Sequence, residues 1–201
     1  MLNQIPRRAL LGGLTGACFA ARGVSAAEPA GEVESSRGEC YAAAAAARRV
    51  LAPAAELFIG DTVGTGAQSA LGLQLGTATK VKLGAETQLR IDRFVVKAGG
   101  ILVLDRGGML YDHDPSGGPS DVALRTPFGL VAVRGTRFFA GPSNGVFGVF
   151  VELGEVTVVG VNTAVVVTSQ FGTDIARPGD EPTPPHPWGA ARIAAAMASV
   201  N

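Results

Sequence analysis

Two carboxylates flank a histidine at Asp112-His113-Asp114, a combination of residue types that can hold a metal ion. Neighbouring side chains on an extended chain point to opposite faces, so three consecutive residues rarely converge on one ion. The segment continues into Pro115-Ser116-Gly117-Gly118-Pro119, which is rich in turn formers. His186 is the one other histidine, so a two-histidine site has little material. We therefore predict a solvated loop here and no metal site.

Residue types and spacing predict no catalytic residue elsewhere. Cys40 has no obvious base near it in the sequence, and no phosphate-binding Gly-x-x-x-x-Gly-Lys loop occurs. Glu152 and Glu155 flank a predicted turn, which favours two exposed acids. A glycosidase-like pair of spaced carboxylates stays open, because any two acids can meet in space. We expect no cofactor.

The elements that carry these residues are short strands. In residues 121–161 apolar residues alternate with others, as at Val149, Val151 and Leu153. Thr126-Pro127-Phe128-Gly129 interrupts the pattern, because proline cannot donate to a ladder and glycine accepts turn angles. A period of two with β-branched residues and such breaks predicts an antiparallel sheet with one buried face.

An eight-residue repeat precedes this region, and each unit contributes an apolar pair, a glycine and a threonine. The matching sets are Leu73, Val81 and Leu89; Leu75, Leu83 and Ile91; Gly76 and Gly84; Thr79 and Thr87. A short unit of this kind cannot bury its apolar face alone, so neighbouring units must stack. We therefore predict an all-β fold of stacked short strands, either β-solenoid-like or a jelly-roll-like sandwich.

Two stretches resemble the FecR family of bacterial periplasmic domains. The first follows Ile59 and reads Gly-Asp-x-Val-x-Thr-Gly. The second combines a Thr-Pro pair, a valine-rich strand that ends in Arg-Gly-Thr, and a later strand, with Leu153 as a departure from the family pattern. Its matching positions are Thr126, Pro127, Val131, Val133, Arg134, Gly135, Thr136, Val151, Gly154 and Val156. The resemblance runs from about Ile59 to Gly160.

The resemblance implies a non-catalytic binding or signalling role. In complete FecR regulators, a periplasmic part senses an occupied outer-membrane receptor and signals through a membrane helix to a cytoplasmic segment that controls a sigma factor. This chain is predicted to lack that helix and that segment. The positions predicted to bind are Arg134, Thr136 and Thr126. At Arg134, a guanidinium that pins a corner of the fold is the structural alternative.

The amino terminus reads as an export signal over residues 1–26. Arg7-Arg8 precedes an uncharged apolar run from Ala9 to Ala21, and Val24-Ser25-Ala26 supplies small residues for cleavage. The run is too short to span a bilayer as a helix, which needs about 20 residues. The paired arginines resemble a twin-arginine signal. We therefore expect a periplasmic protein without a stable membrane span in the mature chain.

The segment after the signal, residues 27–56, is predicted to contain a polar lead-in from Glu28 to Gly38 and an alanine-rich helix from Glu39 to Leu51. Alanine is the best helix former, and six alanines follow one another here. A low-complexity tether is the alternative. Cys40 would lie on this helix, either as an inert residue or in an intermolecular disulfide.

The β domain is assigned to residues 57–172, and residues 173–201 are assigned to a proline-rich segment and a C-terminal helix. The predicted docking face of that helix consists of Trp188, Ile193 and Met197.

Composition narrows the class of partner. The chain has 17 basic and 17 acidic side chains, and loss of the signal removes three arginines and no acid, which leaves a net charge of −3. A nucleic-acid binder would need a basic face or stripe. We predict a module that binds a protein or an envelope polymer in the periplasm; the alternative is an envelope carbohydrate-active hydrolase.

Overall fold

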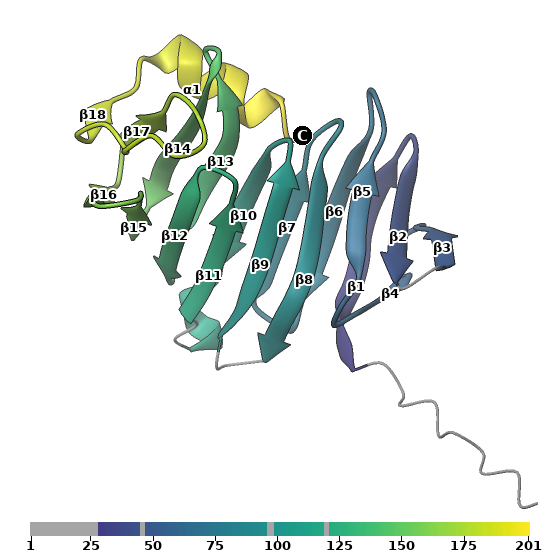
Figure 1. Cartoon of the computed structure of the whole chain (residues 1–201). Coiled ribbons are helices and arrows are strands. Elements are labelled where there is room, and N and C mark those ends of the chain that lie inside the picture. The colour runs from purple at the N-terminus through teal and green to yellow at the C-terminus, as the bar shows by residue number, and fades with distance from the viewer. Residues whose placement is uncertain (1–27, 45–46, 96–98, 119–120) are drawn as a thin grey trace, which may run out of the picture.

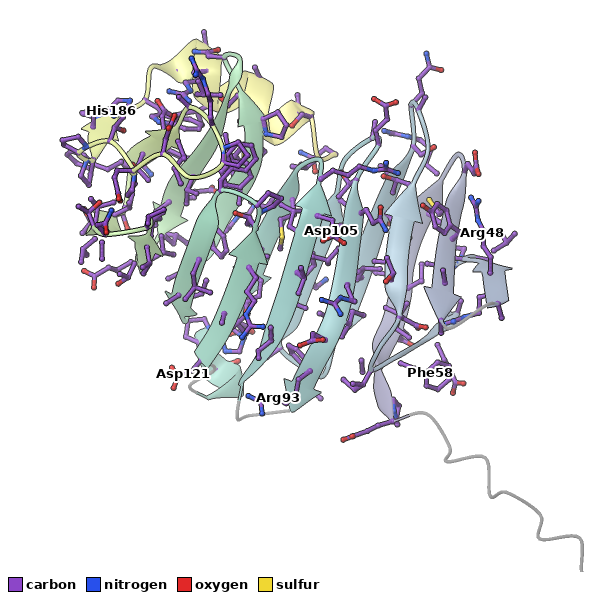
Figure 2. All side chains as sticks on the ribbon, in the orientation of Figure 1. Arg48, Phe58, Arg93, Asp105, Asp121 and His186 are labelled. Carbon is purple, nitrogen blue, oxygen red and sulfur yellow. The ribbon has the colours of Figure 1, made fainter. Side chains whose placement is uncertain are left out.

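The computed structural model describes residues 28–201 except 45–46, 96–98 and 119–120. Within these residues two nine-stranded sheets face each other, and one α-helix lies outside them (Figure 1). The sandwich is long in the direction in which strands are added. Arg48 marks one end and His186 the other (Figure 2). The predicted export signal lies outside the described residues.

The first sheet, called sheet A, contains in spatial order β18 (His186–Pro187), β17 (Phe171–Ile175), β14 (Val146–Leu153), β13 (Arg137–Ser143), β10 (Met109–His113), β7 (Thr79–Leu83), β6 (Ala70–Leu75), β1 (Pro29–Arg37) and β4 (Glu56–Phe58). The second, sheet B, contains β16 (Ala164–Thr168), β15 (Glu155–Val159), β12 (Gly129–Arg134), β11 (Asp121–Thr126), β9 (Gly99–Arg106), β8 (Gln88–Val95), β5 (Thr62–Thr65), β2 (Cys40–Ala44) and β3 (Ala47–Val50). A short 3₁₀ helix, η1 (Pro115–Gly117), and the helix α1 (Ala190–Ala198) complete the described elements.

From β5 onward the chain alternates between the two sheets and lays down mostly hairpins. The pairs β6–β7, β8–β9, β11–β12, β13–β14 and β15–β16 are antiparallel. Strand β10 crosses alone to sheet A, so β9 and β11 become parallel neighbours in sheet B. The predicted all-β fold of stacked short strands is confirmed, and of the two architectures left open the structure is a two-sheet sandwich.

The repeat residues lie in the core between the sheets. Leu73, Val81 and Leu89 are fully buried, and Leu73 lies opposite Val81 in the β6–β7 pair. The two Gly-x-x-Thr corners differ, however. Gly76 to Thr79 turns the chain within sheet A, whereas Gly84 to Thr87 carries it across to sheet B. One sequence repeat therefore encodes two kinds of connection.

The predicted alanine-rich helix is wrong, because this segment forms β2 and β3 in sheet B. Tyr41 lies opposite Gly64 of β5 on one side and Val50 of β3 on the other. Ala42 and Cys40 are buried against the core. Helix propensity is a weak local preference, and the ladder with β5 together with core burial outweighs it. The polar lead-in is likewise a strand, β1, which pairs with β6 and β4.

The predicted C-terminal helix is confirmed as α1, which covers part of the outer face of sheet A. Trp188, Ile193 and Met197 pack with Phe139 and Phe150 of the sheet, as expected for the docking face. The tryptophan ring lies directly on two glycines, because a Cβ at Gly148 or Gly172 would come within 2.6 Å and 2.2 Å of it. The guanidinium of Arg192 stacks on the same ring, with its Cζ 3.5 Å from the ring centroid.

Candidate functional site

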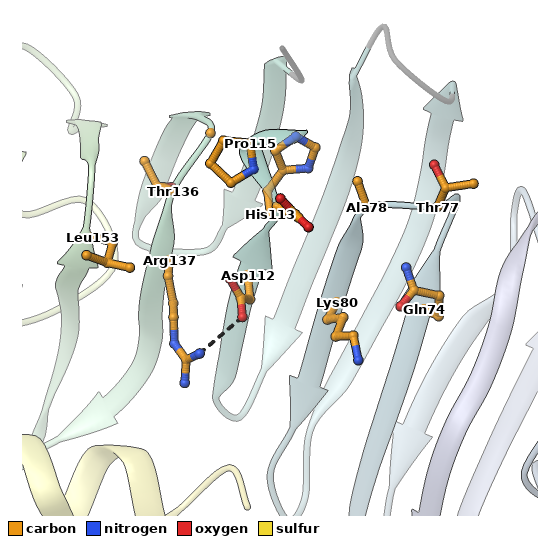
Figure 3. A pocket seen from close by; sticks show the side chains of 12 residues that line it. Gln74, Thr77, Ala78, Lys80, Asp112, His113, Pro115, Thr136, Arg137 and Leu153 are labelled. Carbon is orange, nitrogen blue, oxygen red and sulfur yellow. Dashed lines mark hydrogen bonds and ion pairs between the residues drawn. The ribbon is translucent and has the colours of Figure 1, made fainter. Parts of the chain in front are cut away.

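A pocket of about 400 Å³ opens where the β6–β7 turn, η1 and the β12–β13 link meet, at one end of the strands of sheet A (Figure 3). We call it the polar pocket, because most of the side chains that line it are polar. Part of its wall is the outer face of sheet A and part is loop. It is lined by Gln74, Thr77, Ala78, Lys80, Asp112, His113, Asp114, Pro115, Gly135, Thr136, Arg137 and Leu153. The stretch around the Arg-Gly-Thr motif thus contributes directly to the pocket.

His113 lies at the back of this pocket and is buried, so the predicted solvated loop is wrong for this residue. Its Nδ1 is 2.9 Å from Oγ1 of Thr79, and its Nε2 is 2.9 Å from the carbonyl oxygen of Gly118. Since a carbonyl can only accept, Nε2 carries the proton, and in the neutral ring Nδ1 accepts from the threonine hydroxyl. Both nitrogens are engaged, so the imidazole holds β7, β10 and the loop after η1 together.

The two acids beside His113 have separate roles. Asp112 faces outward from β10, and its Oδ2 accepts a hydrogen bond from Arg137 Nη1 at 3.1 Å. Asp114 caps η1 by accepting from the main-chain N–H of Ser116 at 2.8 Å, and this hydrogen bond lowers the pKa of Asp114. Within the described residues no group of three histidine, cysteine or acidic side chains is placed to hold a metal ion.

Charged side chains form a row across the outer face of sheet A. Lys80 lies opposite Asp112, which in turn lies opposite Arg137 on the next strand. Arg137 also donates from Nε to Glu152 Oε2 at 2.8 Å, and Lys80 pairs with Glu34 of β1. Signs alternate along this row, and each charge lies near an opposite one: Glu34 meets Lys80 across the intervening strand β6, and the other pairs join neighbouring strands. Period-two alternation predicts that these residues point outward, but not which of them become neighbours.

Thr136 is the predicted binding residue that lines the pocket. It lies in the link between β12 and β13 and is 1% exposed. Its methyl group faces Gly154, where an added Cβ would lie 2.6 Å from Cγ2. Its hydroxyl is buried and has no hydrogen-bond partner among the described residues. Thr136 therefore supports the pocket wall from within, and its hydroxyl is one of the few buried polar atoms in the described part of this region without a protein partner.

The other two predicted binding residues are Arg134 and Thr126, and Thr126 is not among the residues that line the pocket. Arg134 ends β12 and its main chain pairs with Asp121, but its side chain lies outside the described part of the structure. Thr126 lies at the opposite end of the same hairpin. Its hydroxyl accepts from the N–H groups of Phe128 and Gly129, both at 3.1 Å, and donates to the Gly129 carbonyl. The geometry of Thr126 is that of a turn-closing residue.

The pentapeptide Gly141-Pro142-Ser143-Asn144-Gly145 matches the Gly-x-Ser-x-Gly spacing of serine-hydrolase elbows. That motif requires a strand-to-helix turn, whereas here the segment belongs to the β13–β14 hairpin. Ser143 Oγ accepts a hydrogen bond from Arg192 Nε at 2.9 Å, so a cation rather than a base engages the hydroxyl. The match therefore does not create a nucleophile.

A second pocket, which the sequence did not indicate, opens at the opposite end of the strands. It measures about 380 Å³ and is mostly apolar, with Phe128 and Phe147 stacked at a centroid distance of 4.5 Å. Pro127 and Pro142 also line it. The Thr-Pro-Phe-Gly turn thus borders this apolar pocket, and the Arg-Gly-Thr link borders the polar one.

Comparison with known proteins agrees with the sandwich and its motifs. Residues 61–157 match the family model described as FecR protein. The chain carries a FecR domain. The polar pocket lies wholly within this FecR domain, since its lining residues run from Gln74 to Leu153. Strands β1–β4, strands β16–β18 and α1 lie outside the matched residues.

Two crystal structures of a "putative anti-sigma factor" from Parabacteroides distasonis resemble this chain. The first has a TM-score of 0.56 and 16% sequence identity and covers 68% of this chain and 64% of that one. The second has a TM-score of 0.55 and 17% identity and covers 68% and 63% of the two chains. This chain thus spans less than two thirds of either solved protein, and the likeness is one of fold. No curated protein matches the chain.

Proposed function

We propose that this chain is a non-catalytic signalling module of the cell envelope that binds a protein or an envelope polymer through the polar pocket. The observation that carries the proposal is the position of that pocket. It lies within the FecR domain, beside the Arg-Gly-Thr link, and it brings the charged side chains of Lys80, Asp112 and Arg137 to one cavity.

The state of the acids in the pocket supports binding rather than hydrolysis. Asp112, which lines the pocket, and the nearby Glu152 both accept hydrogen bonds from Arg137, so a cation rather than a substrate hydroxyl engages each carboxylate. The pKa of Asp114 is lowered, whereas a glycosidase acid requires a raised pKa. A surface of paired charges suits recognition of a polar partner.

A regulatory role in the periplasm is part of the same proposal. The FecR match and the fold shared with the solved anti-sigma-type proteins support signalling. The arginine pair and apolar run in residues 1–26 support export. No helix in the described part of the chain has the length and apolar character needed to cross a membrane.

Photo-crosslinking in intact cells tests this proposal. A photoreactive amino acid replaces Thr77, an exposed residue of the pocket wall, and the matched control replaces Val50, which is exposed on β3 at the far end of the sandwich. We expect a discrete adduct from position 77 in the periplasmic fraction and none from position 50. Arg137→Ala should weaken the adduct at position 77, whereas Arg48→Ala, a change at an exposed distant arginine, should leave it intact.

Three results would count against the proposal. The first is equal labelling at positions 77 and 50, and the second is a protein found only in the cytoplasm. The third is turnover of peptidoglycan or another glycan by the purified chain that stops in Asp112→Asn or Glu152→Gln. That third result would establish the hydrolase alternative.

A further inference from the structure

The two sheets have four outer edges, and three of them carry features that block pairing with another strand. Edge strand β18 has two residues and contains Pro187, and β4 has three residues. Edge strand β3 has four residues, two of which are Arg48 and Arg49. Short length, proline and positive charge are the usual means by which proteins protect sheet edges.

The fourth edge, β16, lacks all three protections. It has five residues, Ala164-Val165-Val166-Val167-Thr168, with no proline and no charge. Within the described residues β15 is its one strand partner. Val167 points into the core, whereas Val166 points outward and is 51% exposed. An uncharged valine-rich edge of this kind is a template for a further strand.

The turn that precedes β16 is firmly held, so the edge is preformed. The Glu181 carboxylate accepts hydrogen bonds from the main-chain N–H groups of Asn162 and Thr163, at 2.8 and 3.1 Å, and from both of their side chains. These bonds fix the tail against the β15–β16 turn without covering the strand. A partner strand therefore meets an ordered edge and pays little additional ordering entropy.

Exposed apolar side chains gather around the same edge. The described residues contain five large exposed hydrophobic side chains, and three of them lie on β16 or within three residues of its ends in the chain: Val161, Val166 and Phe171. The fourth, Leu153, ends β14 in sheet A and lines the polar pocket. The fifth, Val50, is on β3 at the other end of sheet B. This clustering marks an interaction surface.

We propose that β16 pairs with β16 of a second copy of this chain, antiparallel and about a two-fold axis through Val166. Val166 then faces its own symmetry mate, Val165 faces Val167 of the other copy, and Ala164 faces Thr168. The inward-facing valines of the two copies continue one buried layer. The two B sheets become one continuous sheet across the dimer.

The absence of charged residues on β16 favours a second copy of this chain as its partner. In a symmetric pair each residue meets residues of the same strand, so a charged strand would place like charges opposite each other. Strand β3 could not pair with itself for this reason, because its two arginines would meet. Strand β16 carries no charge and is self-complementary. The inference does not depend on the binding function proposed above, since no residue of β16 lines the polar pocket.

Analytical ultracentrifugation of the purified full chain, at concentrations from about 1 µM to about 1 mM, tests the dimer. This wide range is needed because pairing through one five-residue strand per copy buries little surface and gives weak association. We expect a concentration-dependent monomer–dimer equilibrium. Val166→Lys and Val166→Glu should each be monomeric, because like charges then face each other across the axis. An equal mixture of the two variants should restore the dimer, because Lys then faces Glu.

Val50→Lys is the matched control, because it adds the same charge at an exposed valine on a different edge, and it should dimerise like the wild type. Circular dichroism and thermal melting of each variant show that loss of the dimer is not loss of the fold. A wild-type chain that stays monomeric at about 1 mM overturns the proposal. So does a dimer that Val166→Lys leaves unchanged, or one that the mixed variants fail to restore.

Discussion

Arg49 donates from both terminal nitrogens to the two carboxylate oxygens of Asp61, an acid that is only 1% exposed. The main-chain N–H of Phe58 donates to the same carboxylate at 2.9 Å. The pair ties β3 to the turn before β5, across twelve residues of sequence. This ion pair gives the Asp of the Gly-Asp-x-Val motif a structural role. It also stabilises the extended conformation of Arg49, at the end of the alanine-rich segment, as part of a strand.

Asp61→Ala should destabilise the protein by about 2–3 kcal/mol. Breaking a fully buried ion pair costs about 3–5 kcal/mol, and Arg49 remains 38% exposed, so solvent screens part of the loss. The neighbouring pair of Arg48 and Glu39 is the control, because both of its side chains are exposed. Glu39→Ala should cost less than about 1 kcal/mol. Urea denaturation of the two variants measures the difference, and equal losses would contradict this account.

Thr79→Val should destabilise the fold by about 1–3 kcal/mol, because it keeps the shape of the side chain but leaves Nδ1 of the buried His113 without its partner. Thr77→Val, two residues earlier on the exposed turn, should change stability by no more than about 0.5 kcal/mol. Denaturation midpoints of the two variants give the comparison. A small effect of Thr79→Val would mean that the imidazole finds another partner.

Acid should release the tail from the β15–β16 turn. The hydrogen bond from the Thr163 hydroxyl, followed by that from the Asn162 N–H, lowers the pKa of Glu181 in the folded state. A carboxyl whose folded pKa is lowered contributes stability above its ordinary value, and loses that contribution as pH falls through the lowered value. The amide NMR signals of Asn162 and Thr163 should therefore shift at a pH below about 4.3, the usual range of glutamate.

Glu181→Gln should abolish this transition at Asn162 and Thr163, since an amide does not titrate there. Glu155→Gln, at an exposed acid on the adjacent strand, should leave the transition in place. A midpoint at or above the ordinary glutamate range would show that the hydrogen bonds do not favour the ionised form.

Cys40 should resist thiol reagents at neutral pH until the protein unfolds. Burial is the largest effect on its thiol and raises the pKa above the ordinary value for cysteine. The side chain of Cys40, the first residue of β2, is buried in the core, so reagents are blocked from it as well. In a Cys18→Ser background, a colorimetric thiol assay should give a rapid reaction only after denaturant is added. Val50→Cys, at a side chain that is 85% exposed, supplies the fast reference.

This outcome also separates the two alternatives for Cys40. A native-state reaction as fast as that of Val50→Cys, or a disulfide-linked dimer on a non-reducing gel, would contradict an inert buried thiol. The dimer proposed at β16 needs no thiol and should survive reducing agent unchanged.

The candidate site was only partly predictable from the sequence. The Arg-Gly-Thr motif drew attention to the correct segment, and Thr136 does line a pocket. The partnership of Arg137 with Asp112 and Glu152 was not predictable, because it depends on the register between strands 25 and 15 residues apart. Thr126 belongs to the same motif, yet the hairpin carries it to the opposite end of β12.

The sequence by itself determined that Leu73 to Ile91 and the later valine-rich stretches form short strands with one buried face. Alternation of apolar and polar residues is a local property of the chain. An extended strand with one buried face places all the apolar side chains of such a pattern in the core. The tertiary structure alone decided that the alanine-rich segment is extended, because a ladder with β5 and the contact of Arg49 with Asp61 outweigh a local preference of tenths of a kcal/mol per residue. It also decided which corners turn within a sheet and which cross between sheets, since that choice is settled by neighbours far away in the chain.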